Sequence, residues 1–322
     1  MTYNIEILPS GIMFTSENTL LDDALVQSVP LEHSCKSGDC GICEAELISG
    51  IVENENGEHV TSGKILTCCS KACSDLTLNA HYYPELVDIK SQTFPCKVET
   101  IDFPAHDIAV LKLRLPPTAN FNYLPGQYID LNYKGTIRSY SIANAQTVST
   151  GLELHIRHLP QGAMSELIFS AVNSNQLMRI EGPKGTFFVR SDNKPLIFIA
   201  GGTGFAPIKA MVEALLAQQD KRAITIYWGM PHKESFYSDI AQQWSTDHDH
   251  INYIPVLSEH DPSWLGRTGY VHQGIVDDFD SLTRYQVYAC GSPVMIEATK
   301  EALIAKNLAV ENFFADAFTP AK

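Results

Sequence analysis

The sequence predicts a multidomain protein in which an α+β unit, an antiparallel β-barrel and an α/β unit follow one another. Three observations support this fold class. The 322 residues exceed what one hydrophobic core usually supports. Short strands separated by Pro, Gly and Asn occupy the middle of the chain, and strands alternate with helices beyond Pro195. We therefore expect a β-grasp unit at residues 1–82, a linker at 83–94, a barrel at 95–190 and a doubly wound parallel sheet at 191–322.

The first unit begins with two predicted strands, residues 3–8 and 11–15, joined as a hairpin at Pro9-Ser10-Gly11. Residues 19–28 carry apolar side chains at helical spacing. Strand patterns follow at residues 44–48 and 76–78, and a weakly patterned linker comes after them. This order of elements suits a small β-grasp unit.

The two later units differ in the length and order of their elements. The middle unit has predicted strands at residues 110–115, 127–131 and 152–156, which suggest an antiparallel barrel. The last unit has predicted strands at residues 196–200, 223–228, 253–257 and 286–289, with helices at 207–217, 237–244 and 293–305. That alternation predicts a parallel sheet covered by helices on both faces.

Composition and charge indicate the cellular compartment of the protein and argue against some classes of partner. Hydrophobic residues make up 44% of the chain, and no apolar run approaches the ~20 residues that span a membrane. Residues 1–6 lack the basic flank and apolar core of a secretory signal, so we expect a cytoplasmic protein. The net charge of -14 argues against nucleic acid or a membrane surface as a partner, because both favour basic proteins.

The most specific motif is the Cys-x4-Cys-x2-Cys run formed by Cys35, Cys40 and Cys43, with Cys68 downstream. This spacing is typical of the four thiolates that hold a plant-type 2Fe-2S cluster, in which each iron takes two of them. Four ordinary thiols or a zinc site are the alternatives. Zinc sites favour two Cys-x2-Cys pairs, and this sequence offers one.

The fourth ligand has two neighbouring competitors, Cys69 and Cys73. We choose Cys68 because it follows the apolar residues 65–66 at the position expected for that ligand. For the other two thiols we expect a packing or surface role. Residues 1–80 carry 12 acidic and 3 basic side chains, so this unit would be steered towards a basic patch on an electron acceptor.

Two motifs in the barrel predict a flavin site. Arg138-Ser139-Tyr140-Ser141 offers a cation for a phosphate, an aromatic face for the ring and a hydroxyl near the reactive ring nitrogen. Gly162-Ala163-Met164-Ser165 is a predicted helix start whose N–H groups would face a pyrophosphate. Either motif alone also fits an ordinary strand or helix start, but their order and context together indicate FAD.

The last unit contains two glycine-rich turns at predicted strand ends. Gly201-Gly202-Thr203-Gly204 leads into a helix with Pro207 in its first turn, an arrangement that binds a pyrophosphate or a nicotinamide ribose. It lacks the Gly-x-Gly-x-x-Gly spacing, and a tight turn without ligand is the alternative. Cys290-Gly291 repeats the arrangement, with a thiol that would lie beside the nicotinamide C4 or be a buried structural cysteine.

Two further residues complete the predicted nucleotide site. Phe318 would cover the flavin ring where the nicotinamide enters, or anchor the end of the chain. Glu234 would hold the adenosine ribose hydroxyls and favour NADH. Its neighbour Lys233 would instead suit the 2′-phosphate of NADPH, so both donors stay open.

Taken in order, these three segments resemble the ferredoxin-NADP reductase superfamily, in the branch with an N-terminal plant-type ferredoxin domain. The resemblance covers essentially the whole chain. It implies an NAD(P)H-dependent iron-sulfur flavoprotein reductase in which NADH delivers a hydride to FAD and electrons pass singly to the 2Fe-2S cluster. By this resemblance Ser141, Cys290 and Phe318 would have catalytic roles.

Four shorter segments are similar to members of the family that serve 3,6-dideoxyhexose biosynthesis: residues 82–86, 226–231, 236–240 and 313–318. This similarity implies a pyridoxamine-phosphate-dependent CDP-4-keto-6-deoxyglucose 3-dehydratase as the electron acceptor. The alternative within the enzyme class is the reductase component of an aromatic-ring dioxygenase or a phenol or alkane monooxygenase. Outside the enzymes, the alternative is a redox sensor that does not turn over a substrate.

Overall fold

The computed structural model describes residues 1–148 and 151–318. The chain folds as two compact units, Met1–Lys90 and Ser91–Lys322, and their boundary falls inside the predicted linker. The start of that linker packs on the first unit, because Tyr83 is buried and its N–H donates to Pro30 O at 3.1 Å. Its end belongs to the second unit, whose first strand begins at Gln92.

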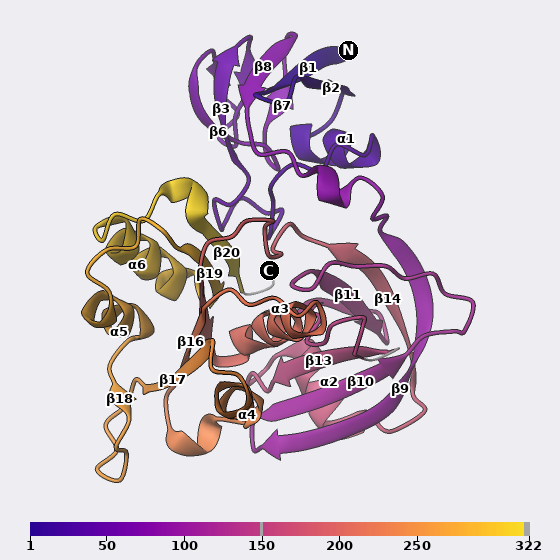
Figure 1. The fold of residues 1–322 in the computed structure, drawn as a ribbon. Helices are drawn as coiled ribbons and strands as arrows, with labels where there is room; N and C mark the ends of the chain where they lie inside the picture. Colours follow the sequence, from indigo (N-terminus) through magenta and orange to yellow (C-terminus); the bar gives the residue numbers. More distant parts are fainter. Residues whose placement is uncertain (149–150, 319–322) are drawn as a thin grey trace. The chain divides into compact units, whose positions relative to one another are not determined.

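The first unit is a β-grasp fold, in which one helix packs on a five-stranded mixed sheet (Figure 1). The sheet has the order β2-β1-β8-β3-β6 and contains β1 (Tyr3–Leu8), β2 (Ile12–Ser16), β3 (Glu44–Ser49), β6 (Gly63–Leu66) and β8 (Leu76–Asn79). Strands β1 and β8 are parallel and the other neighbours are antiparallel. Helix α1 (Leu20–Val26) is shorter than predicted because the Thr19 hydroxyl caps its start, accepting a hydrogen bond from Asp22 N.

Three short strands and one 3₁₀ turn complete this unit. They are β4 (Val52–Glu53), β5 (His59–Val60), β7 (Lys71–Ala72) and η1 (Pro84–Leu86). The strands form a separate sheet in the order β5-β4-β7. Two alternating strands predicted from the sequence, β3 and β8, lie side by side in the main sheet, where their inward side chains fill the core.

The second unit begins with a six-stranded antiparallel barrel. Its strands, in the order β12-β11-β14-β9-β10-β13, are β9 (Gln92–Ala105), β10 (Ile108–Arg114), β11 (Tyr128–Tyr133), β12 (Thr136–Ser141), β13 (Leu152–Arg157) and β14 (Leu177–Lys184). A bridge between Ile142 and Leu154 joins the two edge strands, so the sheet closes on itself. Helix α2 (Ala163–Ala171) packs beside β12. The predicted barrel is confirmed.

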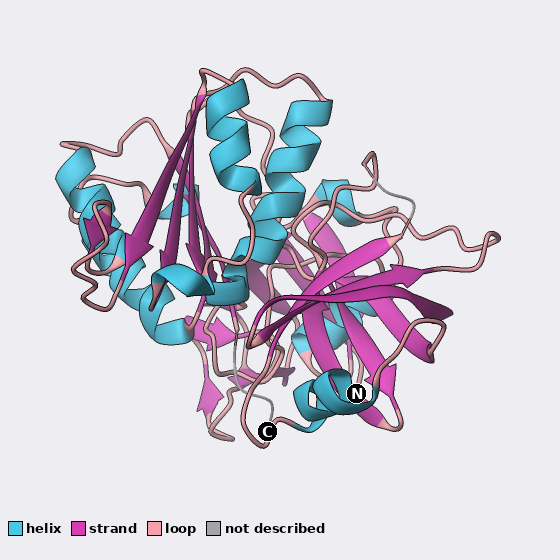
Figure 2. Cartoon of the chain, turned by 90° about the horizontal axis from the view of Figure 1, so that it is seen from below, coloured by secondary structure: helices cyan, strands magenta, loops and turns pink. Residues whose placement is uncertain are grey.

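A six-stranded parallel sheet forms the rest of this unit. Its strands, in the order β18-β17-β16-β15-β19-β20, are β15 (Leu196–Gly201), β16 (Ile224–Met230), β17 (Ile251–Leu257), β18 (Arg267–Thr268), β19 (Gln286–Gly291) and β20 (Phe313–Ala317). The helices are α3 (Phe205–Ala217), α4 (Ile240–Asp247), α5 (Val271–Asp278) and α6 (Pro293–Ile304). Helices α3 and α4 cover one face and α5 and α6 the other (Figures 1 and 2). The predicted doubly wound sheet is confirmed.

Three 3₁₀ turns lie at loops of this sheet: η2 (Gly202–Gly204), η3 (Lys233–Ser235) and η4 (Val310–Asn312). The strand order reverses between β15 and β19, whose carboxyl ends therefore flank the crevice where α/β sheets bind ligands. The helix predicted at residues 237–244 is observed at Ile240–Asp247. Tyr237 lies before this helix, and its hydroxyl lies 2.9 Å from His155 Nδ1 of the barrel.

Candidate cofactor sites

The four predicted cluster ligands lie together in two pairs. Cys43 Sγ is 3.1 Å from Cys68 Sγ, and Cys35 and Cys40 share a hydrogen bond. Pairing of Glu44 with Leu66 across β3 and β6 brings Cys43 and Cys68 together. The Thr67 N–H and hydroxyl both donate to Cys43 O at 3.1 Å, which fixes the loop that follows.

The thiols in each pair polarise one another. The hydrogen bond shared with Cys40 lowers the pKa of the Cys35 thiol, and the hydrogen bond shared with Cys68 lowers the pKa of the Cys43 thiol. In the described part of the chain, no three His, Cys, Asp or Glu side chains converge as a metal-binding group. The two cysteine pairs offer two thiol donors at each of two positions. This arrangement fits a two-iron cluster, in which bridging sulfides complete the coordination of each iron. It fits less well a zinc ion, which takes four protein ligands at one position.

Gly38 and Gly41 shape the loop between the first three cysteines. Their φ angles of 81° and 69° lie in the left-handed region, which glycine adopts without steric cost. A Cβ on Gly38 would also lie 3.0 Å from Cys69 Sγ, which is itself 3.5 Å from Cys68 Sγ. Cys69 is therefore a near neighbour of the site, whereas Cys73 lies beside His59 Nε2 at 3.8 Å.

The predicted flavin motif occupies the last four residues of β12. Tyr140 is partly buried against the barrel core, which raises the pKa of its hydroxyl, and Ser141 is 5% exposed. Ser139 Oγ already donates to Asp130 Oδ1 at 2.5 Å. Among described residues, the Arg138 guanidinium makes one hydrogen bond, to Ile137 O at 2.7 Å, so its other N–H groups can bind a phosphate.

The predicted pyrophosphate motif forms the start of α2. Gly162 is the N-cap, and the N–H groups of Ala163, Met164 and Ser165 fall in the first turn, where a helix offers no carbonyl partner. The side chain of Ser165 is directed elsewhere, because its hydroxyl bonds to Leu159 O at 3.1 Å and to Gly162 O at 3.0 Å. This segment therefore offers backbone donors to an anion and no serine hydroxyl.

The structure brings the two predicted glycine-rich turns together. Ala200 pairs with Cys290 in the parallel sheet, so both turns lie at the carboxyl ends of adjacent strands. A Cβ on Gly204 would lie 2.1 Å from Cys290 O, which explains why only glycine fits there. Phe318 N donates to Gly291 O at 2.8 Å and joins the C-terminal aromatic residue to this site.

The side chains of this site differ in access. Cys290 is fully buried, and burial raises the pKa of its thiol well above the usual range, so the thiol is neutral. Phe318 is 36% exposed. Glu234 and Lys233 are both exposed in η3, which follows the carboxyl end of β16. The geometry accordingly leaves both the NADH and the NADPH interpretation of this turn open.

Two aromatic residues that sequence reasoning did not single out hold the glycine turn. Trp228 Nε1 donates to Gly202 O at 2.9 Å. Its ring stacks on Phe205 at 4.0 Å between centroids and an interplanar angle of 11°. The available signal was their position, since Phe205 directly follows Gly204 and Trp228 is the last residue of the strand predicted at residues 223–228.

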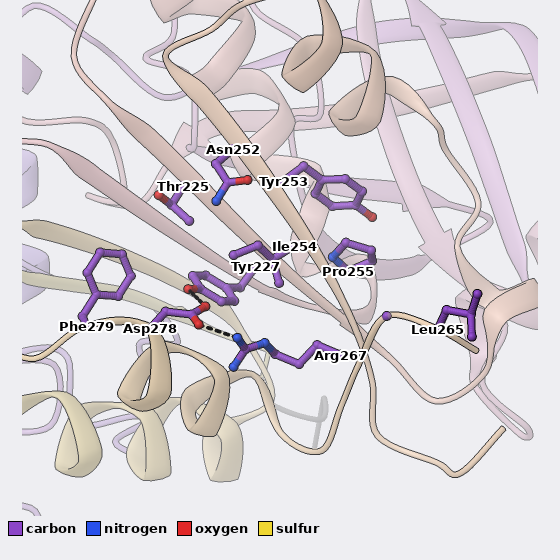
Figure 3. Close-up of a pocket in the computed structure, with 11 residues that line it drawn as sticks. Thr225, Tyr227, Asn252, Tyr253, Ile254, Pro255, Leu265, Arg267, Asp278 and Phe279 are labelled. Atoms are coloured by element: carbon purple, nitrogen blue, oxygen red, sulfur yellow. Dashed lines mark hydrogen bonds and ion pairs between the residues drawn. The ribbon is translucent and has the colours of Figure 1, made fainter. Parts of the chain in front are cut away.

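An open hollow of about 810 Å³ lies on another part of the sheet (Figure 3). Its lining comes from β16, β17, β18 and the end of α5, and it includes none of the predicted cofactor residues. Asp278 accepts hydrogen bonds there from the Tyr227 hydroxyl, at 2.6 Å, and from Arg267. This polar cluster ties α5 to the sheet.

The fold and these sites together define an electron-transfer flavoprotein with an iron-sulfur domain. Three family models match: the 2Fe-2S iron-sulfur cluster binding domain at residues 5–73, the oxidoreductase FAD-binding domain at 95–189 and the oxidoreductase NAD-binding domain at 198–301. The chain belongs to the iron-sulfur flavoprotein reductases of the ferredoxin-NADP reductase superfamily. Among the described residues, no helix has both the length and the apolar character to span a membrane.

Relatives and one solved structure place the chain within this family. It is 53% identical to Protein RfbI of Salmonella typhimurium, covering 99% of this chain and 97% of that protein. It is 52% identical to the CDP-6-deoxy-L-threo-D-glycero-4-hexulose-3-dehydrase reductase of Yersinia pseudotuberculosis over 100% of both chains. Terephthalate 1,2-dioxygenase reductase component 1 of Comamonas sp is 33% identical, over 99% of this chain and 98% of that protein. The crystal structure of the cytochrome P450 reductase GcoB of Amycolatopsis is similar to this one, with a TM-score of 0.81 and 25% sequence identity. The match covers 99% of this chain and 100% of that chain.

Proposed function

We propose that this protein passes electrons from NADH, through FAD and a 2Fe-2S cluster, to a pyridoxamine-phosphate-dependent CDP-4-keto-6-deoxyglucose 3-dehydratase. The observation that carries this proposal is the 52% identity with a CDP-hexulose 3-dehydrase reductase over the whole length of both chains. The dioxygenase reductase component is markedly more distant, at 33%. The reaction of the sugar itself would take place on the partner enzyme.

When bound, FAD accepts two electrons as a hydride and releases them one at a time to the cluster, so the cofactors carry the redox chemistry. The chain binds and orients these groups. Cys35, Cys40, Cys43 and Cys68 would hold the two irons, as their pairing supports. Arg138, Tyr140 and the N–H groups of residues 163–165 would bind the flavin nucleotide, with Ser141 beside the reactive ring nitrogen.

The carboxyl ends of β15 and β19 would bind the nicotinamide half of NADH. Gly201–Gly204 lets the backbone approach closely, and Phe318 would cover the flavin ring until the nicotinamide displaces it. Glu234 would receive the adenosine ribose. We also propose that the protein works in the cytoplasm, since a chain that gives four of its eight cysteines to a cluster suits a reducing compartment.

The experiment is a comparison of electron acceptors. Purified protein loaded with FAD and iron is mixed with NADH and either the CDP-sugar dehydratase with its substrate or a terephthalate-type dioxygenase. We expect the dehydratase to accelerate NADH oxidation at least tenfold over the rate without acceptor, and the dioxygenase to leave it unchanged. Acceleration by the dioxygenase alone would contradict the proposed partner, and no NADH oxidation with ferricyanide would contradict the reductase activity.

Ionic strength provides a second test of the same proposal. Residues 1–80 have 12 acidic and 3 basic side chains, so a basic patch on the dehydratase would be attracted to the cluster unit. Dehydratase reduction should slow as salt rises, because the screening length falls from ~10 Å at 0.1 M to ~3 Å at 1 M. A dehydratase rate that rises with salt would contradict an acidic docking surface.

A further inference from the structure

A chain of buried polar side chains crosses from the barrel to the parallel sheet inside the second unit. Glu153 on β13 lies at its centre. Glu153 Oε1 accepts hydrogen bonds from His155 Nε2 at 2.9 Å and from Lys209 Nζ at 3.0 Å. Lys112 Nζ lies 4.0 Å from the other carboxylate oxygen of Glu153. Strand β13 is thereby bonded to α3.

One arm of this network runs through α3 to the segment after the flavin motif. Lys209 Nζ donates to Glu213 Oε1 at 2.6 Å and to Ala143 O at 3.0 Å. Glu213 Oε2 accepts the backbone N–H of Ala145 at 2.9 Å. Ala143 and Ala145 come directly after the Arg138–Ser141 strand end, while α3 begins directly after the Gly201–Gly204 turn. This arm therefore bonds the backbone next to one predicted site to the helix that starts at the other.

The other arm runs through Tyr237 to the glycine turn itself. His155 donates from Nε2 to Glu153, so its Nδ1 accepts from the Tyr237 hydroxyl at 2.9 Å. The Tyr237 ring meets Trp228 edge to face, with centroids 5.0 Å apart. Trp228 Nε1 in turn donates to Gly202 O. The barrel strand is thus connected to both the turn and the helix of the nucleotide site.

The burial of these groups makes the network rigid. The exposed fraction of the side chain is 2% for His155, 12% for Lys209 and Glu213, and 15% for Glu153. A buried charge that loses its partner strongly destabilises the folded state. We therefore expect these side chains to keep the one arrangement in which every group has a partner. The two ligand sites cannot shift against each other without breaking several of these bonds.

We propose that Lys209, Glu213 and His155 are positioning residues, which fix the nicotinamide turn against the flavin motif at the separation that hydride transfer requires. This inference rests on the proposed reductase function. A hydride moves only between atoms held about 3–3.5 Å apart, so small displacements from residues outside the site lower the rate strongly. The network touches neither cofactor motif with a side chain of its own, apart from the Trp228 contact.

The test uses the full-length protein loaded with FAD and iron. In Glu213→Leu, the Ala145 N–H and Lys209 Nζ both lose this acceptor, while in Glu213→Gln the amide oxygen still accepts from the Ala145 N–H and only the bond from Lys209 is lost. Stopped-flow flavin reduction by NADH should be at least tenfold slower in Glu213→Leu and within threefold of wild type in Glu213→Gln. Hydrogen–deuterium exchange at Ala145, measured without NADH, should be faster in the leucine variant only. Lys221→Met, an exposed lysine just beyond α3, is the matched control and should leave both unchanged.

Two outcomes separate the inference from the proposed function. Wild-type flavin reduction in Glu213→Leu, with faster exchange at Ala145, would overturn the positioning role and leave the reductase function intact. Absence of NADH-driven flavin reduction in the wild-type protein would overturn the proposed function and the inference with it. Tyr237→Phe, which removes one hydroxyl and keeps the ring, covers the case in which Glu213→Leu does not fold. We expect slower flavin reduction with an unchanged NADH dissociation constant, and a wild-type rate would again overturn the inference.

Discussion

The cluster loop and the barrel–sheet interface organise their polar side chains in opposite ways. In the cluster loop, the thiols pair with one another, Cys35 Sγ also accepts from the Ser37 N–H at 3.5 Å, and Cys35 and Cys40 remain partly exposed. In the interface, the charges of Glu153, Lys209 and Glu213 are satisfied by the protein alone. The difference suits the first region to binding a metal cluster through its thiols, and the second to holding the barrel and the parallel sheet together through its ion pairs.

The largest expected effect is loss of the cluster. Cys35→Ser, Cys40→Ser, Cys43→Ser and Cys68→Ser should each abolish the visible absorption of the 2Fe-2S cluster, because an iron loses one of its two protein ligands. Flavin absorption should remain, since the flavin motif belongs to the other unit. The matched controls Cys69→Ser and Cys73→Ser should keep the cluster spectrum. A bleached Cys69→Ser with a coloured Cys68→Ser would reverse the ligand assignment.

Flavin binding should be the next most sensitive property. Arg138→Ala removes a charge-assisted contact to phosphate worth about 1.5–3 kcal/mol, so FAD affinity should fall by roughly 10- to 150-fold. The readout is the FAD content of the purified protein and the dissociation constant from a fluorescence titration. Arg179→Ala changes an exposed arginine of β14 in the same sheet and should keep full occupancy. Equal FAD affinity in both variants would contradict the flavin placement.

Two substitutions in the Gly201–Gly204 turn test how closely its backbone approaches the neighbouring atoms. A methyl group on Gly204 would meet the Cys290 carbonyl, whereas one on Gly201 would meet the flexible side chain of Met295 at 2.5 Å. Gly204→Ala should therefore cost about 1–3 kcal/mol of stability and weaken NADH binding, with a smaller effect for Gly201→Ala. Thermal unfolding and an NADH titration measure these effects. Equal stability of the two variants would argue against the close approach of Gly204 to the end of β19.

The smallest expected effect is the pH dependence of the interface. Burial acts to raise the pKa of Glu153, but hydrogen bonding to His155 and the Lys209 charge outweigh it and lower the pKa to about 2. A carboxyl with a depressed pKa stabilises the fold above its unfolded pKa, and this contribution is lost as pH falls from about 4.5 towards 2. It amounts to at most about 3 kcal/mol. Burial also lowers the pKa of His155, so its contribution is lost as pH falls below about 6.5.

Urea unfolding followed by tryptophan fluorescence isolates this contribution, because all three tryptophans lie in the second unit. Wild type should be more stable than Glu153→Gln at pH 7, and the difference should shrink as pH falls below about 4.5. A difference that stays constant down to pH 3 would show that the Glu153 carboxylate is not held by the network.

The contrast between the two regions also explains what the sequence could predict. The predicted cluster ligands fall within residues 35–68 and obey a fixed spacing, so local reasoning selected four thiols that the structure brings together, and their role as ligands stays a prediction. The alternating patterns of the strands likewise predicted the β-grasp, barrel and parallel-sheet architecture. The interface network was not predicted, because His155 and Tyr237 are 82 positions apart and each resembles an ordinary buried residue of its own element.

Three smaller features show the same limit. The start of α4 was placed at Tyr237 instead of Ile240, because apolar spacing indicates that a helix exists better than it locates the first residue. Helix α5 was not predicted because its eight residues include Gly274 and two aspartates, which weaken a helical signal. The choice between Glu234 and Lys233 stays undecided because both side chains are exposed and neither is fixed by packing.

The central claim is that electrons enter at the second unit and leave through the cluster unit. The most direct measurement compares the full-length protein with a chain that begins at Ser91, the boundary between the two units. The shortened chain should keep FAD and oxidise NADH with ferricyanide at a rate within threefold of the full-length protein, yet fail to reduce the purified dehydratase. If the shortened chain reduced the dehydratase at the full rate, the cluster would not lie on the path to the partner and the account would be wrong.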